Sequence, residues 1–465
     1  MSSPTPTLPR RAFLRQACCA AVGTTGLLSS LAQLRVLGAL AGDSLPSRAA
    51  AVPSDYKALV CIFLSGGNDG TNLVVPSDPS SYAAYARVRA ELALPQAQLL
   101  PITTKKYSDG RDYALHPSVP GLQNLYGQGR LAVLANVGTL VEPTTLASYK
   151  AGRGLPVQLH SHVDQTVQWQ SSISDRPFET GWGGRLADIL DGFNSNNQVS
   201  MSITLNGANY FQIGKNVAQF AAGANGAPDF NPHGAGSLYP ARLNALHAAV
   251  GLPQENLLAA AYGKVANTAV VGGAALRSAL QGAPRLNTAF PGSPTANQLG
   301  AVAKMISVAS TLGLKRQIFF VSIGGFDLHN AQAAGHGPIL AELSGARKAF
   351  YDATVELGVA NQVTAFTASD FGRTYAPNVG GTDHGWGNHH LSRGGAVQGG
   401  DIYGRMPSLT IGADDDTDRG RWIPSTSVDE YSATLATWFG VSASNLPIVL
   451  PNIGRFAKPN LGFIG

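Results

Sequence analysis

An aspartate and a histidine follow one predicted strand of this chain, at the point where the strand ends. The apolar, β-branched run 363–368 is typical of a buried strand, and the sequence Ser-Asp-Phe-Gly-Arg-Thr follows it at 369–374. A Thr-Asp-His-Gly turn comes shortly after, at 382–385. Open α/β sheets build their sites at the carboxyl ends of their strands. Asp370 and His384 are therefore candidate metal ligands.

Two more predicted strands end in an aspartate. Asp69 follows the apolar run 57–64 through Ser-Gly-Gly-Asn, and Asp327 follows the run 317–323 through Gly-Gly-Phe, with His329 two residues later. Three carboxylates at one sheet edge would repel one another unless a cation neutralised them. The sequence therefore predicts a metal site, with His329 and His384 as additional ligands.

The chemistry of these side chains indicates which ions would bind. Neutral imidazole and carboxylate together suit zinc or manganese, and calcium or magnesium are the alternatives. Two such ions close together would clamp the attacking and leaving oxygens of a phosphate or sulfate ester. Seven of the ten histidines fall in three short segments, which favours a site: His160, His162, His329, His336, His384, His389 and His390.

The elements that must position these residues alternate between strands and helices. This alternation predicts an α/β fold with a largely parallel sheet flanked by helices. The region from about 210 to 294 is rich in Ala, Asn and Gly and reads as a helical and loop insertion. Further strands are expected at 131–138, 201–205 and 408–411, and helices at 117–127, 161–171, 298–312 and 338–357.

The N-terminus predicts export. Arg10 and Arg11 form a twin-arginine pattern, a small-residue apolar stretch follows from about residue 17 to 34, and Ala39-Leu40-Ala41 offers a cleavage site, with 49–51 as a later candidate. We interpret 1–41 as a signal for the twin-arginine export machinery and 42–465 as a single domain, periplasmic or secreted. The alternative, a retained membrane anchor, is disfavoured because the segment is short and weakly apolar, so no stable membrane span is expected in the mature chain.

Charge distribution argues against nucleic acid as a partner. The formal net charge is +5, but residues 1–41 hold four arginines and no acid, so the remainder carries only about +1. No Lys/Arg cluster with interleaved aromatic residues occurs in that remainder. Two of the three cysteines lie within the export signal, and Cys61 lies in an apolar run that predicts a buried, inert thiol.

Taken together, the motifs resemble the bacterial family called domain of unknown function 1501. The resemblance covers nearly all of the chain after residue 55 and is carried by the Gly-Gly-Asn-Asp-Gly turn at 66–70, by Gly-Phe-Asp-Leu-His at 325–329, and by the segments 369–374 and 381–385. That family looks like a branch of the alkaline phosphatase-like superfamily, which includes sulfatases. The resemblance implies an alkaline phosphatase-like α/β fold and a two-metal centre. Asp327, His329 and His384 would bind one ion, and Asp69 and Asp370 the other.

The resemblance also implies a nucleophile at a helix N-terminus, and the sequence leaves this group open. Ser161 could cap the helix 161–171 and attack, or only cap it. His162 could be a general acid or a ligand, and Thr71 is the less favoured nucleophile. Arg373 is expected to steady an oxyanion. No Cys-x-Pro-x-Arg sulfatase pattern occurs in the sequence.

Two departures from the superfamily pattern weaken the expected second metal. Phe371 stands where a histidine directly after the last aspartate is common, and Asp327 and His329 are two positions apart, where four is usual. The leading expectation is an exported metal-dependent hydrolase of a small-molecule or polymer phosphate or sulfate ester. The alternative is a catalytically inactive envelope binding or assembly protein on the same scaffold.

Three other segments read as mainly structural. The segment 181–186 predicts a loop with an aromatic anchor, and Asp414-Asp415-Asp416 predicts a solvated turn, with calcium binding as the alternative. Residues 386–390 are expected to line the mouth of the site, where His389 and His390 could touch substrate.

Overall fold

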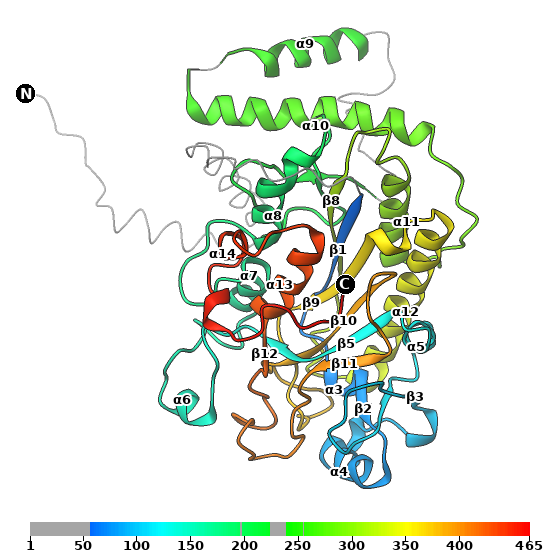
Figure 1. The fold of residues 1–465 in the computed structure, drawn as a ribbon, viewed down its shortest axis with the longest axis vertical. Helices are drawn as coiled ribbons and strands as arrows, with labels where there is room; N and C mark the ends of the chain where they lie inside the picture. Colours follow the sequence, from blue (N-terminus) through cyan, green and yellow to red (C-terminus); the bar gives the residue numbers. More distant parts are fainter. Residues whose placement is uncertain (1–55, 196–197, 224–238, 254) are drawn as a thin grey trace, which may run out of the picture.

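A nine-stranded sheet with helices on both faces forms the centre of the molecule (Figure 1). The computed structural model describes residues 56–195, 198–223, 239–253 and 255–465. Strand β10 is antiparallel to both of its neighbours, β5 and β9, whereas the other pairs of neighbouring strands in this sheet are parallel. The order is β11-β5-β10-β9-β1-β8-β6-β7, with β12 also paired to β5: β1 (Lys57–Leu64), β5 (Leu131–Gly138), β6 (Ser202–Thr204), β7 (Phe220–Ala221), β8 (Arg316–Ile323), β9 (Val363–Ser369), β10 (Asn388–Gly394), β11 (Asp401–Gly404) and β12 (Thr426–Ser427).

The helices divide into two layers, one on each face of the sheet. Helices α5, α11 and α12 cover one face, and α7, α8, α13 and α14 the other (Figure 1). A small antiparallel sheet of β2 (Val74–Pro76), β4 (Tyr113–Leu115) and β3 (Leu100–Ile102) lies beside α4. The helices are α3 (Gly70–Leu73), α4 (Pro79–Arg89), α5 (Pro120–Gly127), α6 (Leu146–Lys150), α7 (His162–Ser171), α8 (Trp182–Leu190), α9 (Tyr239–Gly251), α10 (Leu257–Gln281), α11 (Pro294–Ser307), α12 (Gln332–Glu356), α13 (Val428–Phe439) and α14 (Leu446–Val449).

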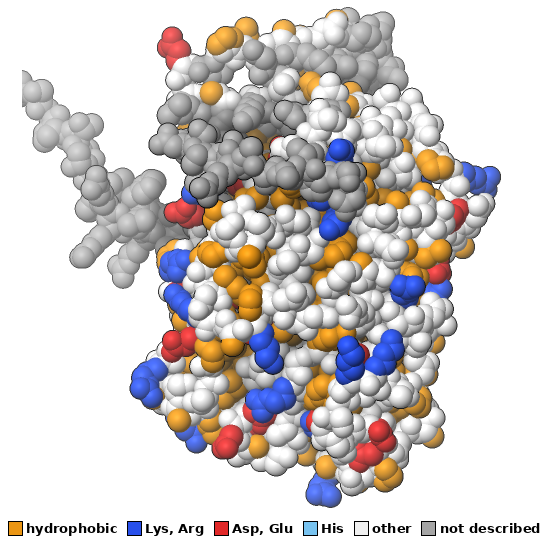
Figure 2. Space-filling view, viewed as in Figure 1, with side chains coloured by type: hydrophobic (Ala, Val, Ile, Leu, Met, Phe, Trp, Pro, Cys, Tyr) orange, Lys and Arg blue, Asp and Glu red, His pale blue; other side chains and the backbone are white. Residues whose placement is uncertain are grey.

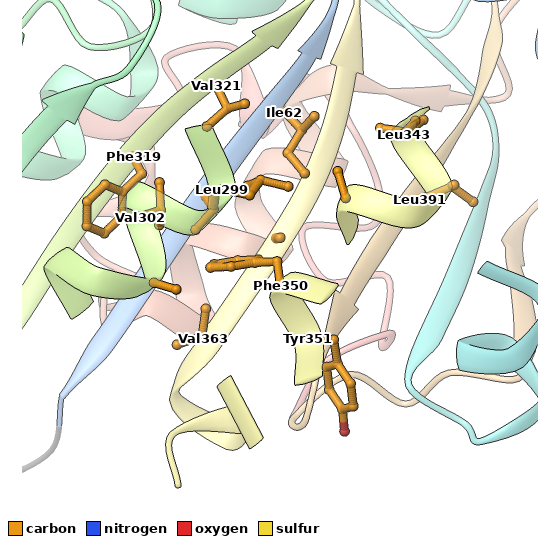
Figure 3. Close-up of a cluster of buried hydrophobic side chains, with 14 of the residues drawn as sticks. Ile62, Leu299, Val302, Phe319, Val321, Leu343, Phe350, Tyr351, Val363 and Leu391 are labelled. Atoms are coloured by element: carbon orange, nitrogen blue, oxygen red, sulfur yellow. The ribbon is translucent and has the colours of Figure 1, made fainter. Parts of the chain in front are cut away.

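Successive side chains of each central strand point alternately into two separate hydrophobic cores. In β1, Val60 and Ile62 pack toward α11 and α12, while Cys61 and Phe63 pack toward α8 and α13. Because successive side chains of a strand point to opposite faces, a strand covered on both sides must be apolar at nearly every position. Figure 3 shows the first core, where side chains of α11 and α12 meet those of β1, β8 and β9. Cys61 is buried, as predicted.

The predicted fold class is confirmed: the sheet is largely parallel and flanked by helices. The predicted strands at 57–64, 131–138, 201–205, 317–323 and 363–368 all form, within one or two residues at their ends. The four predicted helices form too. Two of them begin earlier than predicted: α11 by four residues and α12 by six. Pro338 does not start α12 but lies inside it.

Three local predictions were wrong. Residues 408–411 form no strand, and Leu409 adopts a positive φ of 55° that a strand does not allow. The segment after Gly181 is helix α8, in which Trp182 packs against Phe211 and Phe366. Residues 386–390, expected at the site mouth, are buried, and 388–390 begin strand β10.

The predicted insertion at 210–294 is helical only in part. Strand β7 lies within it and pairs with β6 at the sheet edge, while α9 and α10 lie beyond the sheet at the top of Figure 1. The predicted turn at Asp414-Asp415-Asp416 is confirmed, and Asp416 accepts hydrogen bonds from the amides of Gly412 and Gly420. The export signal at 1–41 lies outside the described residues.

The surface carries few charges. Figure 2 shows Lys, Arg, Asp and Glu side chains singly or in small groups among uncharged atoms, in keeping with a charged fraction of 13%. Within the described ranges, none of the helices combines the length and the apolar composition that crossing a membrane requires.

Candidate metal centre

Glycines after β1 let three loops approach one another closely. Gly66 has a φ of 113°, and a Cβ at this position would lie 2.4 Å from the backbone nitrogen of Asp327. Gly67 has a φ of 82°, and its Cβ would overlap the Phe371 ring at 2.6 Å. Only glycine tolerates both conditions. The Gly-Gly turn therefore brings the loop after β8 and the loop after β9 together.

Four of the predicted or considered site residues form one cluster at this point. Ligand atoms of His162, Asp327 and His384 all lie within 4.8 Å of one another. His329 joins them, because its Nε2 is 2.9 Å from His384 Nε2 and 3.0 Å from Asp327 Oδ1. The Asp327 carboxylate is central: Oδ1 lies 3.3 Å from His384 Nε2, and Oδ2 lies 3.3 Å from His162 Nε2.

The other ring nitrogen of each histidine faces an acceptor. His162 Nδ1 lies 2.6 Å from Asp370 Oδ2, and His384 Nδ1 lies 2.7 Å from the carbonyl oxygen of His160. His329 Nδ1 lies 3.4 Å from Asp383 Oδ1. A carboxylate or carbonyl accepts, so each Nδ1 must donate, and in the neutral imidazole the lone pair then lies on Nε2. Three Nε2 lone pairs therefore face the Asp327 carboxylate.

The cluster is open to solvent on one side and packed on the other. The Asp327 and His329 side chains are 44% and 42% exposed, and that of His162 is 32% exposed. Phe371 is fully buried, and its ring lies 4.7 Å from the His162 ring and 4.6 Å from the His384 ring, centre to centre. Phe371, which departs from the superfamily pattern, thus forms the wall against which two imidazoles pack.

The titratable groups of the cluster differ in the direction of their pKa shifts. The hydrogen bond from His162 to Asp370, with the nearby charge of Asp327, raises the pKa of His162 above its usual value. Burial lowers the pKa of His384. Burial pushes the pKa of Asp327 upward, but hydrogen bonding and charge from Arg373 outweigh it and hold that pKa below its usual value. Asp327 is therefore ionised at neutral pH.

The atoms in the cluster fit a divalent cation. Imidazole nitrogens and a carboxylate are ligands of zinc and manganese, and donors at the far ring nitrogens fix ligand orientation in such sites. His162 Nε2 is buried and has no hydrogen-bond partner, although it points toward the cluster. A buried ring nitrogen without a partner, among other lone pairs, therefore fits a metal ligand.

Asp69 was predicted to be a metal ligand, but its carboxylate binds other groups of the protein. Within the described part of the chain its carboxylate accepts from the Arg89 guanidinium, from Gln332 Nε2 at 2.5 Å and from the Asn72 amide at 3.2 Å. The Asp69 side chain also caps α3. Burial acts to raise its pKa, but Arg89 leaves the pKa below its usual value. These contacts give Asp69 a structural part that ties α3 and α4 to α12.

Asp370 and Arg373, also predicted site residues, contact the cluster from behind. Asp370 accepts from the Gly66 amide at 3.1 Å and from His162 Nδ1, so both of its oxygens have partners. Arg373 is buried; it donates to Asp327 Oδ1 at 2.8 Å and to the carbonyl oxygens of Gly66 and Thr382. The structure thus places Asp370 as an orienting partner of His162, and Arg373 as the counter-charge of Asp327.

The two candidate nucleophiles have structural contacts. Ser161 caps α7, and its Oγ lies 2.6 Å from Asp164 Oδ2. Thr71 is buried in the short helix α3. The sequence pattern correctly placed Ser161 at a helix N-terminus, directly before His162.

The sequence assigned no role to His160 or Asp383, although both orient a proposed ligand. Two residues proposed to touch substrate are buried. His160, with a φ of 70°, presents its carbonyl to His384 and its own Nδ1 to the Gly385 carbonyl at 3.0 Å. Asp383 orients His329 and pairs with Arg419 at 2.7 Å. The proximity of both to a proposed ligand in the sequence was the available signal. His389 and His390 are 3% and 0% exposed in β10, so the expectation that they reach substrate was wrong.

Solved structures with some similarity to the whole chain include sulfatases and an alkaline phosphatase. The sulfatase PsFucS1 from Pseudoalteromonas sp. has a TM-score of 0.34 and 10% identity, over 89% of this chain and 72% of that one. A putative sulfatase from Bacteroides thetaiotaomicron gives 0.34 and 10%, over 86% and 75%. A mutant of the alkaline phosphatase PafA gives 0.27 and 12%, over 70% and 64%. TM-scores this low say nothing about the reaction.

Sequence comparison identifies the family. No curated protein matches the sequence. The model of a family described as "Protein of unknown function (DUF1501)" matches residues 56–428, which include the strands, turns and histidines of the candidate metal centre. The chain therefore belongs to the DUF1501 family, as its motifs predicted.

Proposed function

We propose that the protein is an exported, metal-dependent hydrolase of phosphate or sulfate esters. The observation that carries the proposal is the convergence of His162, His329 and His384 on the Asp327 carboxylate, with each Nδ1 facing an acceptor. A divalent ion held by these four residues would supply Lewis-acid polarisation of an ester oxygen. Zinc or manganese suits this donor set, with calcium and magnesium as alternatives.

The surrounding residues support an anionic ester as the substrate. Each carboxylate around the cluster already has a cationic or hydrogen-bonding partner: Asp327 has Arg373, Asp383 has Arg419, and Asp370 has His162. Arg421 donates to the carbonyl oxygen of His384 at 2.8 Å and is itself paired with Asp418. The charge of a bound cation would therefore remain available to attract a phosphate or sulfate group.

The residues have distinct parts in this proposal. Asp370 accepts a hydrogen bond from His162 Nδ1, and the His160 carbonyl accepts one from His384 Nδ1. Both imidazoles therefore keep the orientation that metal binding needs. Arg373 keeps Asp327 ionised. The Phe371 ring excludes water behind His162 and His384.

A panel of chromogenic esters tests the proposal. The mature protein, loaded with zinc or manganese, should hydrolyse a nitrophenyl phosphate monoester, diester or sulfate, and chelation should abolish the activity reversibly. Asp327→Asn should lower turnover by about 100-fold or more, because it removes the charged ligand. Asp352→Asn is the matched control, because the Asp352 side chain is 42% exposed and is paired with Lys348. No turnover on any ester by the metal-loaded protein would refute the proposal.

One observation favours the second candidate, a catalytically inactive binding or assembly protein of the envelope. Asp69 is bound by Arg89, and Ser161 by Asp164, so the groups that would complete a two-metal hydrolase have other partners. A protein that binds one metal ion per chain with full stability, yet turns over none of the esters, would establish this candidate instead.

Export is the remaining part of the proposal, supported by the twin arginines and the apolar stretch that follows them. A bacterial host with a twin-arginine system should release the mature chain into its periplasm or medium. Replacing Arg10 and Arg11 together by lysine should leave the uncleaved precursor in the cytoplasm. Unchanged release of the double variant would contradict this route.

A further inference from the structure

Two buried arginines come from α12 and β10 and are close enough for the charge of one to act on the other. Arg347 on α12 is 0% exposed, and Arg393 on β10 is 1% exposed. Arg347 Nη2 reaches the carbonyl oxygen of Leu391 at 3.4 Å, and the Arg393 guanidinium lies 4.9 Å from the centre of the Phe350 ring. Phe350 and Leu391 are both labelled in Figure 3. Within the described residues, no carboxylate forms an ion pair with either arginine.

Four donor atoms of this pair are buried without an acceptor. They are Nε and Nη1 of Arg347, and Nε and Nη2 of Arg393. The aromatic rings of Phe350 and Tyr351 do not satisfy them, because a ring stabilises a guanidinium through its charge, whereas the N–H groups require acceptors such as an anion or an oxygen atom. The pair therefore lacks hydrogen-bond acceptors.

The pair also lacks negative charge. Burial of an unpaired guanidinium is costly, and two like charges side by side in an apolar core repel each other. Burial and, second, the charge of Arg347 act to lower the pKa of Arg393. Asp352 is an acid whose charge acts on Arg393, but Lys348 binds the Asp352 carboxylate at 2.6 Å, and the Asp352 side chain is 42% exposed. Tyr351 is the other titratable group that acts on it.

We propose that Arg347 and Arg393 bind a chloride ion between them. Both arginines are at most 1% exposed, so a ligand between them must be small. A monatomic anion accepts hydrogen bonds from donors in any direction, which suits two guanidinium groups that come from different elements. Chloride supplies both the missing charge and the missing acceptor, and it ties α12 to the middle of the sheet.

The proposed halide site is separate from the candidate metal centre. Arg393 pairs with Ala365 in β9, five residues before Asp370, whose carboxylate contacts His162, and five residues correspond to about 17 Å of strand. The halide is therefore expected to act on stability and not on the esters that the cluster would bind.

Halide replacement tests the proposal in the intact mature protein. Crystals grown in bromide should show an anomalous peak between the two guanidinium groups. Thermal unfolding at constant ionic strength should show a saturable rise of the midpoint, by about 2 °C or more, when chloride replaces gluconate.

Variants connect the chloride effect to the pair. In Arg347→Leu/Arg393→Met the midpoint should no longer respond to chloride, whereas Arg176→Met, which removes an exposed arginine, should respond as the wild type does. No bromide peak at the pair, an Asp352 carboxylate turned onto Arg393, or equal midpoints in chloride and gluconate would each overturn the proposal. The diffraction result stands for the wild type even if the double variant does not fold.

Discussion

At the scale of single residues, the candidate metal centre depends on what each imidazole binds at its second nitrogen. Asp370, Asp383 and the His160 carbonyl face the three Nδ1 atoms and leave the three Nε2 atoms directed at Asp327. Such partners fix the tautomer and the orientation of a ligand. Because Asp370, Asp383 and the His160 carbonyl already orient the three imidazoles, the cluster can form before a metal ion binds.

Gly66 is the residue on which the close approach of the loops depends most. Gly66→Ala should destabilise the protein by about 3 kcal/mol or more, because the new Cβ would lie 2.4 Å from the Asp327 nitrogen at a φ of 113°. Gly110→Ala is the matched control: Gly110 has a φ of 82° but open space around it, so only the backbone cost of about 1 kcal/mol is expected. Urea unfolding measures both. Equal losses would contradict the packing described for Gly66.

At the scale of elements, sequence patterns predicted the apolar strands well and the polar ones poorly. The strands β1, β5, β8 and β9 are buried at nearly every position and mostly apolar, because both of their faces are covered. The β10 sequence Asn-His-His-Leu-Ser-Arg-Gly carries no such signal, since its buried polar groups depend on partners distant in the sequence. Asn388, for example, donates to the carbonyls of Asn68 and Phe371.

The same limit explains which parts of the site could be predicted. The residue types at strand ends predicted that Asp327, His329 and His384 lie together, because loops at the ends of parallel strands converge, and the structure brings these three side chains together. They could not distinguish a carboxylate that would bind metal from one that binds arginine or orients a histidine. Asp327 also pairs with an arginine, but its side chain is 44% exposed, whereas Asp69 and Asp370 are buried. Asp69 is bound by Arg89 and Gln332, and Asp370 faces His162 Nδ1, and these partners lie 20 or more residues away in the sequence.

The N-terminus of α7 allows a test of whether Ser161 only caps. Ser161→Ala should cost about 1 kcal/mol of unfolding free energy, and Ser161→Asn, which retains a capping oxygen, should recover most of it. If Ser161 only caps, both variants keep ester hydrolysis within a factor of about three of wild type, measured at saturating metal. If hydrolysis is lost in both while metal binding persists, Ser161 is the nucleophile.

At the scale of the whole molecule, the fold buries several histidines in their neutral form. Burial lowers the pKa of His116, His336 and His389 to about 4, and that of His390 to about 3. An unfolded histidine takes up its proton near pH 6.5. Between these values the unfolded chain binds more protons than the folded one, so stability is greatest above pH 6.5 and falls as the pH falls.

Acid should therefore destabilise the protein well above the pH at which carboxylates titrate. Each of these histidines contributes a slope of about 1.4 kcal/mol per pH unit between pH 6 and 4.5. Urea unfolding at several pH values measures the total slope. His390→Phe should make it shallower, since His390 lies among Trp169 and Tyr431 and a phenyl ring suits that setting. A free energy of unfolding that is the same at pH 7 and pH 4.5 would contradict the buried neutral state.

Metal titration of the purified mature protein tests the central claim most directly. Calorimetry with zinc or manganese should give about one ion per chain in the wild type. Asp327→Asn and His384→Ala should lose binding, and Asp370→Asn should keep the stoichiometry with affinity lowered by about 10- to 100-fold, because Asp370 orients His162 and does not ligate. A wild-type protein that binds less than one ion per chain, or an Asp327→Asn variant that binds as tightly as the wild type, would contradict the assignment of the metal centre.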